Sequence, residues 1–426
     1  MQPPGARTVL VRYGEIGVKS PHVQRRMEKR LRDNLDTALG RRGFDATVSR
    51  EFTRLYVEAP PDQVDGVTDV ITDTFGVVSA SPAVQIDPTM ESITATLGEA
   101  ARRHYDGGSF AVRARRAGED HSFTSKDLEE QGGGAVWEAA EDAGVDPEVD
   151  LDDPDVTVYV ECRSEVAFVF LEKREGPGGL PLGTQEPVVA LVSGGIDSPV
   201  AAWEAMKRGC PVYPLYVDLG EYGGVDNRMR AVETVGTLRE YVPDGDVALR
   251  VAPGGDGIKR IAGAVDTCRM LAVRRYMLRI AEQVADSLGA VGIVTGESIG
   301  QKSSQTGANL RVTDAVTSLP IHRPLATVDK TDITDRARTI GTFDDSTIDM
   351  LERHEGCFVD TSFVRLRDPL ERAVMEHPDR VLFGSGAPAA HPSVAVMEIL
   401  TLEVPEDAMR KVFSKNAARV FEPLSG

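Results

Sequence analysis

Along the first 175 residues, the apolar positions follow two different periods, which predicts helices packed on half-buried strands. Residues 8–13 have the composition of a strand, and residues 21–39 place apolar side chains on one face of a helix. A strand at 55–58 and a helix at 64–75 would complete a small α+β unit. A second α+β unit follows, with expected helices at 90–105 and 126–143 and expected strands at 109–116, 156–161 and 165–171.

From residue 188 onward, two of the expected strands, 188–192 and 290–294, are continuous apolar runs. Val188–Val192 is such a run, and a strand without polar alternation is typical of a parallel sheet that is covered on both faces. Further strands are expected at 212–217, 247–251 and 290–294, and helices at 200–208, 231–241 and 266–288. This alternation predicts a doubly wound α/β domain whose ligand lies beyond the carboxyl ends of the strands.

A loop suited to phosphate follows directly after Val188–Val192. Residues 193–198 have the sequence Ser-Gly-Gly-Ile-Asp-Ser. Two glycines let backbone N–H groups converge on an oxyanion, two hydroxyls add donors, and the next helix points its positive N-terminus at the same place. The loop lacks the Lys of a Walker loop and the G-x-G-x-x-G spacing of a dinucleotide fold. Asp197 suits Mg²⁺, because carboxylate oxygens match this ion. A plain Gly-Gly turn is the alternative.

Length and cysteine usage narrow the class of protein. At 426 residues, the chain has room for two or three domains. No apolar run approaches roughly eighteen residues, and the N-terminus lacks the apolar core of a signal peptide, so a cytoplasmic protein is expected. The cysteines are scattered along the chain, which favours free thiols over a disulfide scaffold; they are Cys162, Cys210, Cys268 and Cys357.

The net charge of −19 by itself counts against a nucleic-acid partner. The charge is unevenly distributed, however, since residues 1–60 contain 12 Lys or Arg and 7 Asp or Glu. Only 10 of the 48 basic residues are Lys, and this acidic, Arg-rich composition suggests adaptation to high salt. At molar salt the screening length is about 3 Å, so local contacts decide whether nucleic acid binds.

Two basic surfaces are candidates for nucleic-acid binding. The strand at 109–116 alternates apolar and basic positions, with Arg113 and Arg115 on its outer side. The helix at 21–39 carries basic residues opposite its apolar face, namely Arg25, Arg26, Lys29 and Arg30. An ordinary solvated surface is the alternative in both cases.

A stretch of about one hundred residues resembles a THUMP domain, an RNA-binding module of tRNA-modifying enzymes. The resemblance is carried by SFAVRARR, by EEQGGGAV and by the segment from VDLDDPDV to GPGGLPLG. It ends in the linker at 176–181. The resemblance implies that this unit binds RNA and that the linker separates it from the α/β domain.

Four motifs of the α/β part together resemble the tRNA 4-thiouridine synthases, which are tRNA sulfurtransferases. The motifs are SGGIDSP, AVRRYM, TGESIGQKSSQT and RPLATVDKTDI, and the first also resembles the loop of the PP-loop ATP pyrophosphatases. The resemblance runs from about residue 8 to about residue 359. It implies a ferredoxin-like unit at 1–62, a THUMP domain at 63–175, a PP-loop domain at 176–360 and an extension of unknown role at 361–426.

The same resemblance assigns residues to an ATP site. Asp197 is implied to act in catalysis together with Mg²⁺. Segments 323–325 and 329–330 are implied to shape the loop that faces tRNA. ATP itself is implied to contact Leu191, Val192, Ser193, Gly194, Gly195, Ser198, Tyr216, Val217, Arg274, Gly296 and Gln305.

Cys357 matches the position of the family's catalytic cysteine; the alternative for a lone cysteine is a small buried apolar residue. A thiol beside His354 could be held as thiolate and carry a persulfide. No cysteine follows Cys357, and no Cys-x-x-Cys pair stands near Cys268. The sulfur donor therefore stays open between a cysteine desulfurase persulfide and free sulfide, and an iron–sulfur cluster stays undecided.

The implied reaction is ATP-dependent thiolation of tRNA. The enzyme would adenylate O4 of the uridine at position 8 and replace the adenylate with sulfur, which gives 4-thiouridine. The alternatives are another PP-loop adenylating enzyme, such as a 2-thiouridylase, and a THUMP protein that binds RNA without catalysis. A homodimer and a second role in thiamine synthesis also stay open.

Overall fold

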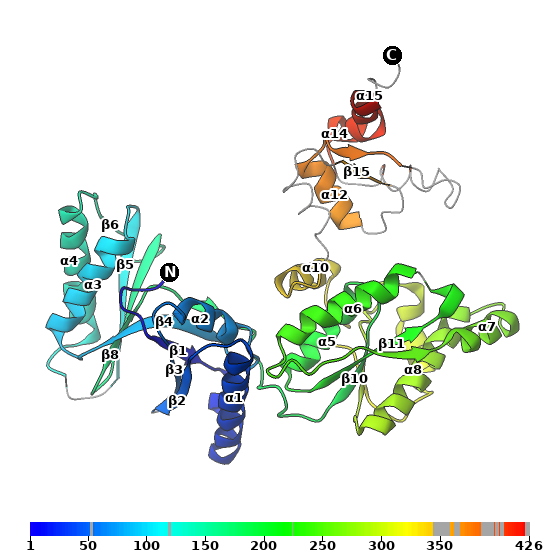
Figure 1. Cartoon of the computed structure of the whole chain (residues 1–426), viewed down its shortest axis with the longest axis horizontal. Helices are drawn as coiled ribbons and strands as arrows, with labels where there is room; N and C mark the ends of the chain where they lie inside the picture. Colours follow the sequence, from blue (N-terminus) through cyan, green and yellow to red (C-terminus); the bar gives the residue numbers. More distant parts are fainter. Residues whose placement is uncertain are drawn as a thin grey trace. The chain divides into compact units, whose positions relative to one another are not determined.

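The computed structural model describes residues 1–51, 54–117, 121–223, 225–343, 358–361, 367–384, 396, 400 and 404–421. They belong to two compact units, residues 1–336 and residues 337–426 (Figure 1). Within these described ranges, no helix is long and apolar enough to cross a membrane.

Nine strands of the first unit form one sheet with the order β2-β3-β1-β4-β8-β7-β5-β6, and β9 pairs with β4. β4 joins the two predicted α+β units, because it pairs antiparallel with β1 on one side and with β8 on the other. The strands are β1 Thr8–Arg12, β2 Thr47–Glu51, β3 Arg54–Glu58, β4 Ser79–Ile86, β5 Ser109–Arg116, β6 Glu148–Val149, β7 Val156–Cys162, β8 Ala167–Phe170 and β9 Arg174–Glu175.

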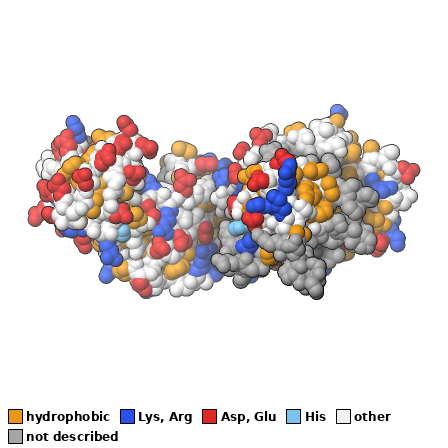
Figure 2. Space-filling model, turned by 90° about the horizontal axis from the view of Figure 1, so that it is seen from above, with side chains coloured by type: hydrophobic (Ala, Val, Ile, Leu, Met, Phe, Trp, Pro, Cys, Tyr) orange, Lys and Arg blue, Asp and Glu red, His pale blue; other side chains and the backbone are white. Residues whose placement is uncertain are grey.

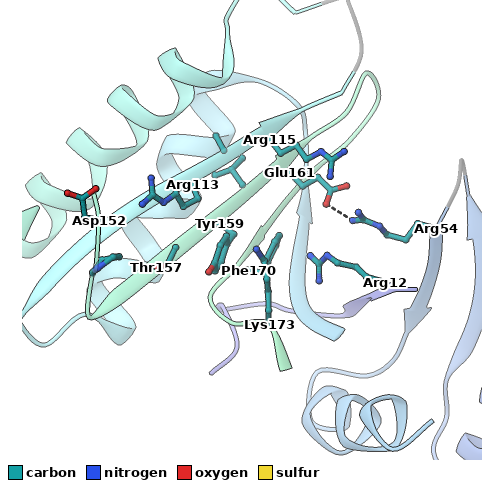
Figure 3. Close-up of a pocket in the computed structure, with 13 residues that line it drawn as sticks. Arg12, Arg54, Arg113, Arg115, Asp152, Thr157, Tyr159, Glu161, Phe170 and Lys173 are labelled. Carbon is teal, nitrogen blue, oxygen red and sulfur yellow. Dashed lines mark hydrogen bonds and ion pairs between the residues drawn. The ribbon is translucent and has the colours of Figure 1, made fainter. Parts of the chain in front are cut away.

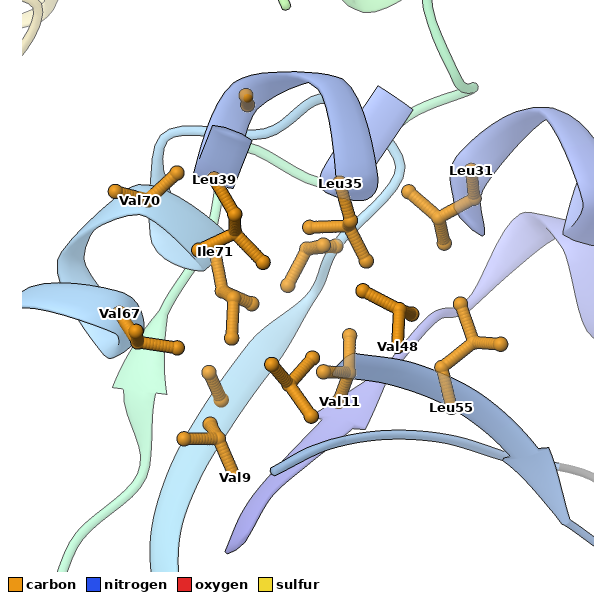
Figure 4. Close-up of a cluster of buried hydrophobic side chains, with 14 of the residues drawn as sticks. Val9, Val11, Leu31, Leu35, Leu39, Val48, Leu55, Val67, Val70 and Ile71 are labelled. Carbon is orange, nitrogen blue, oxygen red and sulfur yellow. The ribbon is translucent and has the colours of Figure 1, made fainter. Parts of the chain in front are cut away.

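Four helices cover one face of this sheet: α1 Pro21–Arg41, α2 Val64–Thr72, α3 Met90–His104 and α4 Ser125–Asp142. Val9 and Val11 of β1 share an apolar core with Leu31, Leu35 and Leu39 of α1 (Figure 4). The period of three and four residues in α1 and the period of two in β1 place these side chains on facing surfaces.

The residues of β4 show that both pairs of helices lie on the same face. Ala80 belongs to the core under α1 and α2, whereas Val84 and Ile86 pack on the core under α3 and α4. Strand residues separated by an even number of positions point to one face. The opposite face carries another cluster, which includes Tyr56 and Phe168.

The second sheet of this unit is parallel and has the order β12-β11-β10-β13-β14. Its strands are β10 Val188–Leu191, β11 Val212–Asp218, β12 Arg250–Pro253, β13 Ile293–Val294 and β14 Ile321–His322. The helices are α5 Asp197–Lys207, α6 Val225–Glu240, α7 Gly255–Ala264, α8 Arg269–Leu288, α9 Gly307–Asp314 and α10 Lys330–Thr339. The doubly wound parallel sheet is thus confirmed, whereas the short helices α7 and α9 were not predicted.

The segment between the two sheets is bound to α1, which packs on the first sheet. The carbonyl of Leu182 accepts hydrogen bonds from Arg30 Nε at 2.9 Å and from Asn34 Nδ2 at 3.1 Å. The Phe75 ring, which follows α2, meets the Trp203 ring of α5 edge-on with 5.2 Å between the centroids. These contacts fix α1 and α2 against the α/β part.

The described residues from 337 onward form a small α/β unit with its own core. β15 Val359–Asp360 and β16 Val381–Leu382 are parallel, and α12 Arg367–Glu376 connects them. Further helical segments are α14 Glu406–Arg410, a π-helical turn at Lys411–Lys415, and α15 Asn416–Phe421. The core consists of Leu370, Ala373, Val374, Val381, Ala408 and Val412.

Candidate active site and RNA-binding surface

The loop at 193–198 connects β10 to α5 and is closed by its own serines. The Ser193 N–H donates to Ser198 Oγ over 2.9 Å, and the two hydroxyl oxygens lie 3.2 Å apart. The Gly195 N–H donates to Ser193 Oγ over 3.4 Å. Since α5 begins at Asp197, the loop and the positive N-terminus of this helix meet in one place. This is the arrangement of an anion site at the carboxyl end of a parallel strand.

Two glycines are required by close contacts around the loop. A Cβ on Gly194 would lie 2.9 Å from the Cα of Asn227. A Cβ on Gly296 would lie 2.7 Å from the backbone nitrogen of Ser198, and real Cβ atoms essentially never come closer than 3.0 Å to such an atom. Only glycine at position 296 lets the chain after β13 touch the first turn of α5.

A cavity of about 320 Å³ lies beside the loop. Leu219 lines it, while Tyr216 and Val217, which are buried within β11, lie outside the lining. Gly194 belongs to the loop but does not line the cavity either. The other residues that the sequence assigns to this site do line it: Leu191, Val192, Ser193, Gly195, Asp197, Ser198, Arg274, Gly296 and Gln305.

An apolar wall of this cavity was missed by the sequence analysis. Met270, Val273 and Met277 of α8 line it next to Arg274. These positions fall on one helical face, so the apolar spacing around the arginine is a signal that could have identified them. An apolar wall beside a polar loop suits a ligand that combines a flat base with charged phosphates.

Arg274 is held in the cavity wall by a chain of ion pairs. Its guanidinium binds the Glu297 carboxylate, which also accepts a hydrogen bond from Nε of Arg323 at 2.7 Å. Arg323 binds Asp314 in turn, at 2.6 Å. Burial alone would lower the pKa of Arg323, but its hydrogen bonds to Asp314 and Glu297 raise it. The paired charges fix Arg274 in one position, since its release would take one of two cationic partners from a carboxylate that is only 14% exposed.

Asp197 lies within reach of a lysine from a distant part of the chain. Nζ of Lys330, the first residue of α10, is 2.5 Å from Oδ1 of Asp197. The sequence predicted only that segment 329–330 shapes a nearby loop. A second carboxylate oxygen is left for Mg²⁺, which proteins commonly bind through one or two carboxylates plus substrate phosphates. Among the described residues, no group of three His, Cys, Asp or Glu could hold a metal ion by itself.

The cysteines differ in exposure, and the predicted catalytic one, Cys357, lies outside the described residues. Cys268 is exposed at the start of α8, with a φ of +58°. Burial raises the pKa of the thiols of Cys162 and Cys210, which makes both poor nucleophiles.

A second cavity, of about 640 Å³, lies on the face of the nine-stranded sheet that is opposite the helices (Figure 3). Arg113 and Arg115 line it, as predicted from their outward position in the strand. Three further basic residues, Arg12, Arg54 and Lys173, were missed. They come from β1, β3 and the segment after β8, so strand pairing alone brings them to Arg113 and Arg115.

Aromatic rings form part of this second cavity. Tyr159 and Phe170 stack with 5.0 Å between their centroids and 9° between their planes. Lys173 Nζ lies 4.0 Å from the centroid of Tyr159, and the Arg12 guanidinium lies 4.9 Å from that of Phe170. Burial, together with the positive charge of Arg54, lowers the pKa of Arg12 to about 10. Cations above flat rings suit a single-stranded nucleic acid, whose phosphates and bases they can both contact.

The basic face of α1 is partly engaged within the protein. Nε of Arg30 binds the carbonyl of Leu182, Lys29 pairs with Asp33 at 2.6 Å, and Nε of Arg25 donates to its own helix. Arg26 is exposed. The structure therefore gives Arg30 a role in holding the segment between the sheets, which the sequence did not predict.

Acidic side chains are frequent on the face of the first unit that Figure 2 shows. Figure 2 shows many Asp and Glu side chains over the end that α3 and α4 form. The basic cavity of Figure 3 is therefore a local exception in a chain whose net charge is −19.

Four family models match the chain. The model described as thiamine biosynthesis protein (ThiI) matches residues 183–377, the ThiI ferredoxin-like domain matches 8–81, and the THUMP domain matches 88–172. The fourth, Amidohydrolase, matches residues 345–422 and overlaps the end of the first match. It falls on the C-terminal part, for which the sequence motifs indicate no family.

Individual relatives extend these matches. A probable tRNA sulfurtransferase of Halobacterium salinarum is 56% identical over 376 residues, which are 88% of this chain and 93% of the relative. A probable tRNA sulfurtransferase of Methanosarcina acetivorans is 41% identical over 346 residues, 80% and 82% of the two chains. The crystal structure of a 4-thiouridine synthetase–RNA complex with bound ATP superposes with a TM-score of 0.69 and 30% identity over 80% of this chain and 86% of that one.

A PP-loop domain joined to an RNA-binding module defines a class of RNA-modifying enzymes that use a nucleotide. Within this class, the chain belongs to the ThiI family of tRNA sulfurtransferases. The protein is therefore a sulfur-transferring enzyme, and the predicted order of ferredoxin-like, THUMP and PP-loop domains is confirmed.

Proposed function

We propose that this enzyme makes 4-thiouridine at position 8 of tRNA in an ATP-dependent reaction in the cytoplasm. The observation that carries the proposal is the cavity at the carboxyl end of β10, where an anion-binding loop, an apolar wall and the Asp197–Lys330 pair meet. The synthetase with bound ATP and RNA has the same fold over most of its length. A non-catalytic RNA-binding protein is not favoured, because the relatives are named tRNA sulfurtransferases. A 2-thiouridylase is not favoured, because the similar solved structure is that of a 4-thiouridine synthetase.

In the first proposed step, O4 of the uridine attacks the α-phosphorus of ATP, and the bond from this phosphorus to the bridging oxygen breaks. Pyrophosphate leaves with the electron pair, and N3 of the base loses its proton. The loop at 193–198 would bind the phosphates, and Arg274 and Lys330 would stabilise the negative charge that develops on them. Asp197 would hold Mg²⁺ together with the phosphates, and this ion would neutralise phosphate charge.

In the second proposed step, a sulfur nucleophile attacks C4 of the base, the C4–O4 bond breaks, and AMP leaves with O4. We assign the sulfur carrier to Cys357. If its persulfide attacks C4, a second thiol must then cleave the S–S bond by attack on Sγ of Cys357, and Cys268 is an exposed candidate. The two steps proposed here do not involve an iron–sulfur cluster.

We propose that tRNA binds across the basic cavity of Figure 3 and the exposed part of α1. The support is charge and shape, since five basic side chains stand around a stacked aromatic pair and outnumber the two acidic side chains of the lining, Asp152 and Glu161. The predicted domain limits also remain proposals, with one change. Because α2 lies in the core of α1, we place the end of the ferredoxin-like domain after β4 rather than at residue 62.

Mass spectrometry of tRNA nucleosides from a deletion strain tests the proposed function. We expect 4-thiouridine to disappear, to return with a plasmid-borne wild-type gene, and to stay absent with an Asp197→Ala gene. The 2-thiouridine content should be unchanged and serves as the internal control. Normal 4-thiouridine in the deletion strain would contradict the proposal. Growth of that strain in medium without thiamine tests separately whether the protein has a second role in thiamine synthesis.

A further inference from the structure

The cavity beside the phosphate loop is lined by four charged side chains, and three of them already have a partner. Asp197 binds Lys330, and Arg274 and Glu297 bind each other. The fourth, Lys302, is exposed and forms no ion pair with any residue that the structure describes. Lys302 is thus the lining cation that can accept an anionic partner without the loss of an existing pair.

The backbone of Lys302 is held in place although its side chain is not. The N–H of Gln305 donates to the Lys302 carbonyl over 2.8 Å, and the Gly300 N–H donates to the Gln305 carbonyl over 3.2 Å. Gln305 is 5% exposed and Arg274 reaches the Ser304 carbonyl, so this short turn is tied to the cavity wall. A flexible ammonium group therefore projects from a fixed point at the cavity.

Removal of Arg274 from Glu297 would have a cost, because these side chains are only 17% and 14% exposed and the carboxylate would lose a buried partner. Binding of a phosphate by Lys302 has no such cost, because Lys302 forms no ion pair with a described residue. Its ammonium group is a compact charge with three rotatable donors, and lysine is a common ligand of phosphate. A phosphate that enters the cavity would gain more from Lys302 than from the paired arginine.

We propose that Lys302 is a phosphate-binding residue of this site, a role that rests on the proposed function. The phosphate belongs either to ATP or to the RNA backbone next to the target uridine, since both must approach the carboxyl end of β13 for the reaction to occur. Binding of either by Lys302 adds one favourable charge contact at the cavity mouth.

Two binding measurements on the full-length protein distinguish these sources: ATP without tRNA, and tRNA without ATP at several salt concentrations. For Lys302→Gln we expect the affinity for either ATP or tRNA to fall about fivefold, which is the effect of losing one solvent-exposed charge pair. If the phosphate is that of RNA, the slope of the logarithm of affinity against the logarithm of salt concentration should also fall by about one. Lys302→Arg should retain wild-type affinity in both measurements.

Lys259→Gln is the matched control, because Lys259 is an exposed lysine of α7 that does not line the cavity and forms no ion pair with a described residue. It should change neither affinity. Unchanged affinities for both ligands in Lys302→Gln, or equal losses in Lys259→Gln, would overturn the inference. A wild-type protein that binds neither ATP nor tRNA would instead contradict the proposed function.

Discussion

At the scale of single residues, Asp197 joins the phosphate loop to α10 through Lys330. Its side chain is about a quarter exposed and takes no part in an apolar core. We predict that Asp197→Ala lowers thiolation about 100-fold or more and leaves tRNA affinity and the melting temperature close to wild type. The measurement is the rate of pyrophosphate release. Release at the wild-type rate would show that Asp197 takes no part in the chemistry.

A substitution at Gly296 tests the shape of the site rather than its charge. A Cβ at this position would lie 2.7 Å from Asp197 C and from Ser198 N. We expect Gly296→Ala to lower the free energy of unfolding by about 1–3 kcal/mol and to weaken ATP binding, since the chain after β13 must move away from α5. Gly307→Ala is the control, because a Cβ there meets nothing within 4 Å. Equal effects of the two substitutions would contradict this account.

Substitutions of the cysteines distinguish two routes of sulfur transfer, one through a persulfide and one by direct attack of sulfide. We predict that Cys357→Ser consumes ATP on tRNA and accumulates adenylated tRNA without 4-thiouridine, because adenylation precedes sulfur transfer. Cys268→Ser should retain some thiolation when free sulfide is supplied. If Cys357→Ser makes 4-thiouridine from sulfide at the wild-type rate, sulfide attacks the adenylate directly and the persulfide route is wrong.

At the scale of elements, the RNA-binding proposal depends on β5, whose outer side carries Arg113 and Arg115. We predict that the double substitution of these residues with Gln weakens tRNA binding and flattens its salt dependence, while ATP binding is unchanged. Substitution of Arg102 and Arg103 with Gln is the control, because they are exposed on α3, which covers the other face of the sheet. Unaltered tRNA affinity in the β5 variant would make its outer side ordinary solvated surface.

The sequence predicted elements better than it predicted the contacts between them. Strand β5 was predicted at 109–116 with the correct side outward, because its apolar and basic residues alternate. Arg12, Arg54 and Lys173 could not be assigned to the same surface, since they come together through pairing of strands distant in sequence. The chain of pairs from Arg274 to Asp314 was missed for the same reason, although the TGES block that contains Glu297 was recognised.

The start of α8 shows another limit of the sequence pattern. The helix was expected from 266, but it begins at Arg269 after Cys268, whose positive φ is rare for residues other than glycine. The apolar period continues through this position and carries no sign of the break.

At the scale of the whole molecule, the net charge of −19 implies self-repulsion that salt should screen. We predict that the melting temperature rises between about 0.1 M and about 1 M potassium chloride, where the screening length falls from about 10 Å to about 3 Å. Thermal unfolding followed by circular dichroism measures this. A melting temperature that falls over this range would contradict the interpretation of the acidic composition.

We propose that one enzyme couples ATP cleavage at the loop 193–198 to thiolation of tRNA. The most direct test incubates the full-length protein with tRNA, MgATP and sulfide, and measures nucleotide products and tRNA nucleosides together. We predict one AMP and one pyrophosphate for each 4-thiouridine formed, with the thiolated base at position 8. Formation of ADP and phosphate, or of 2-thiouridine in place of 4-thiouridine, would contradict it.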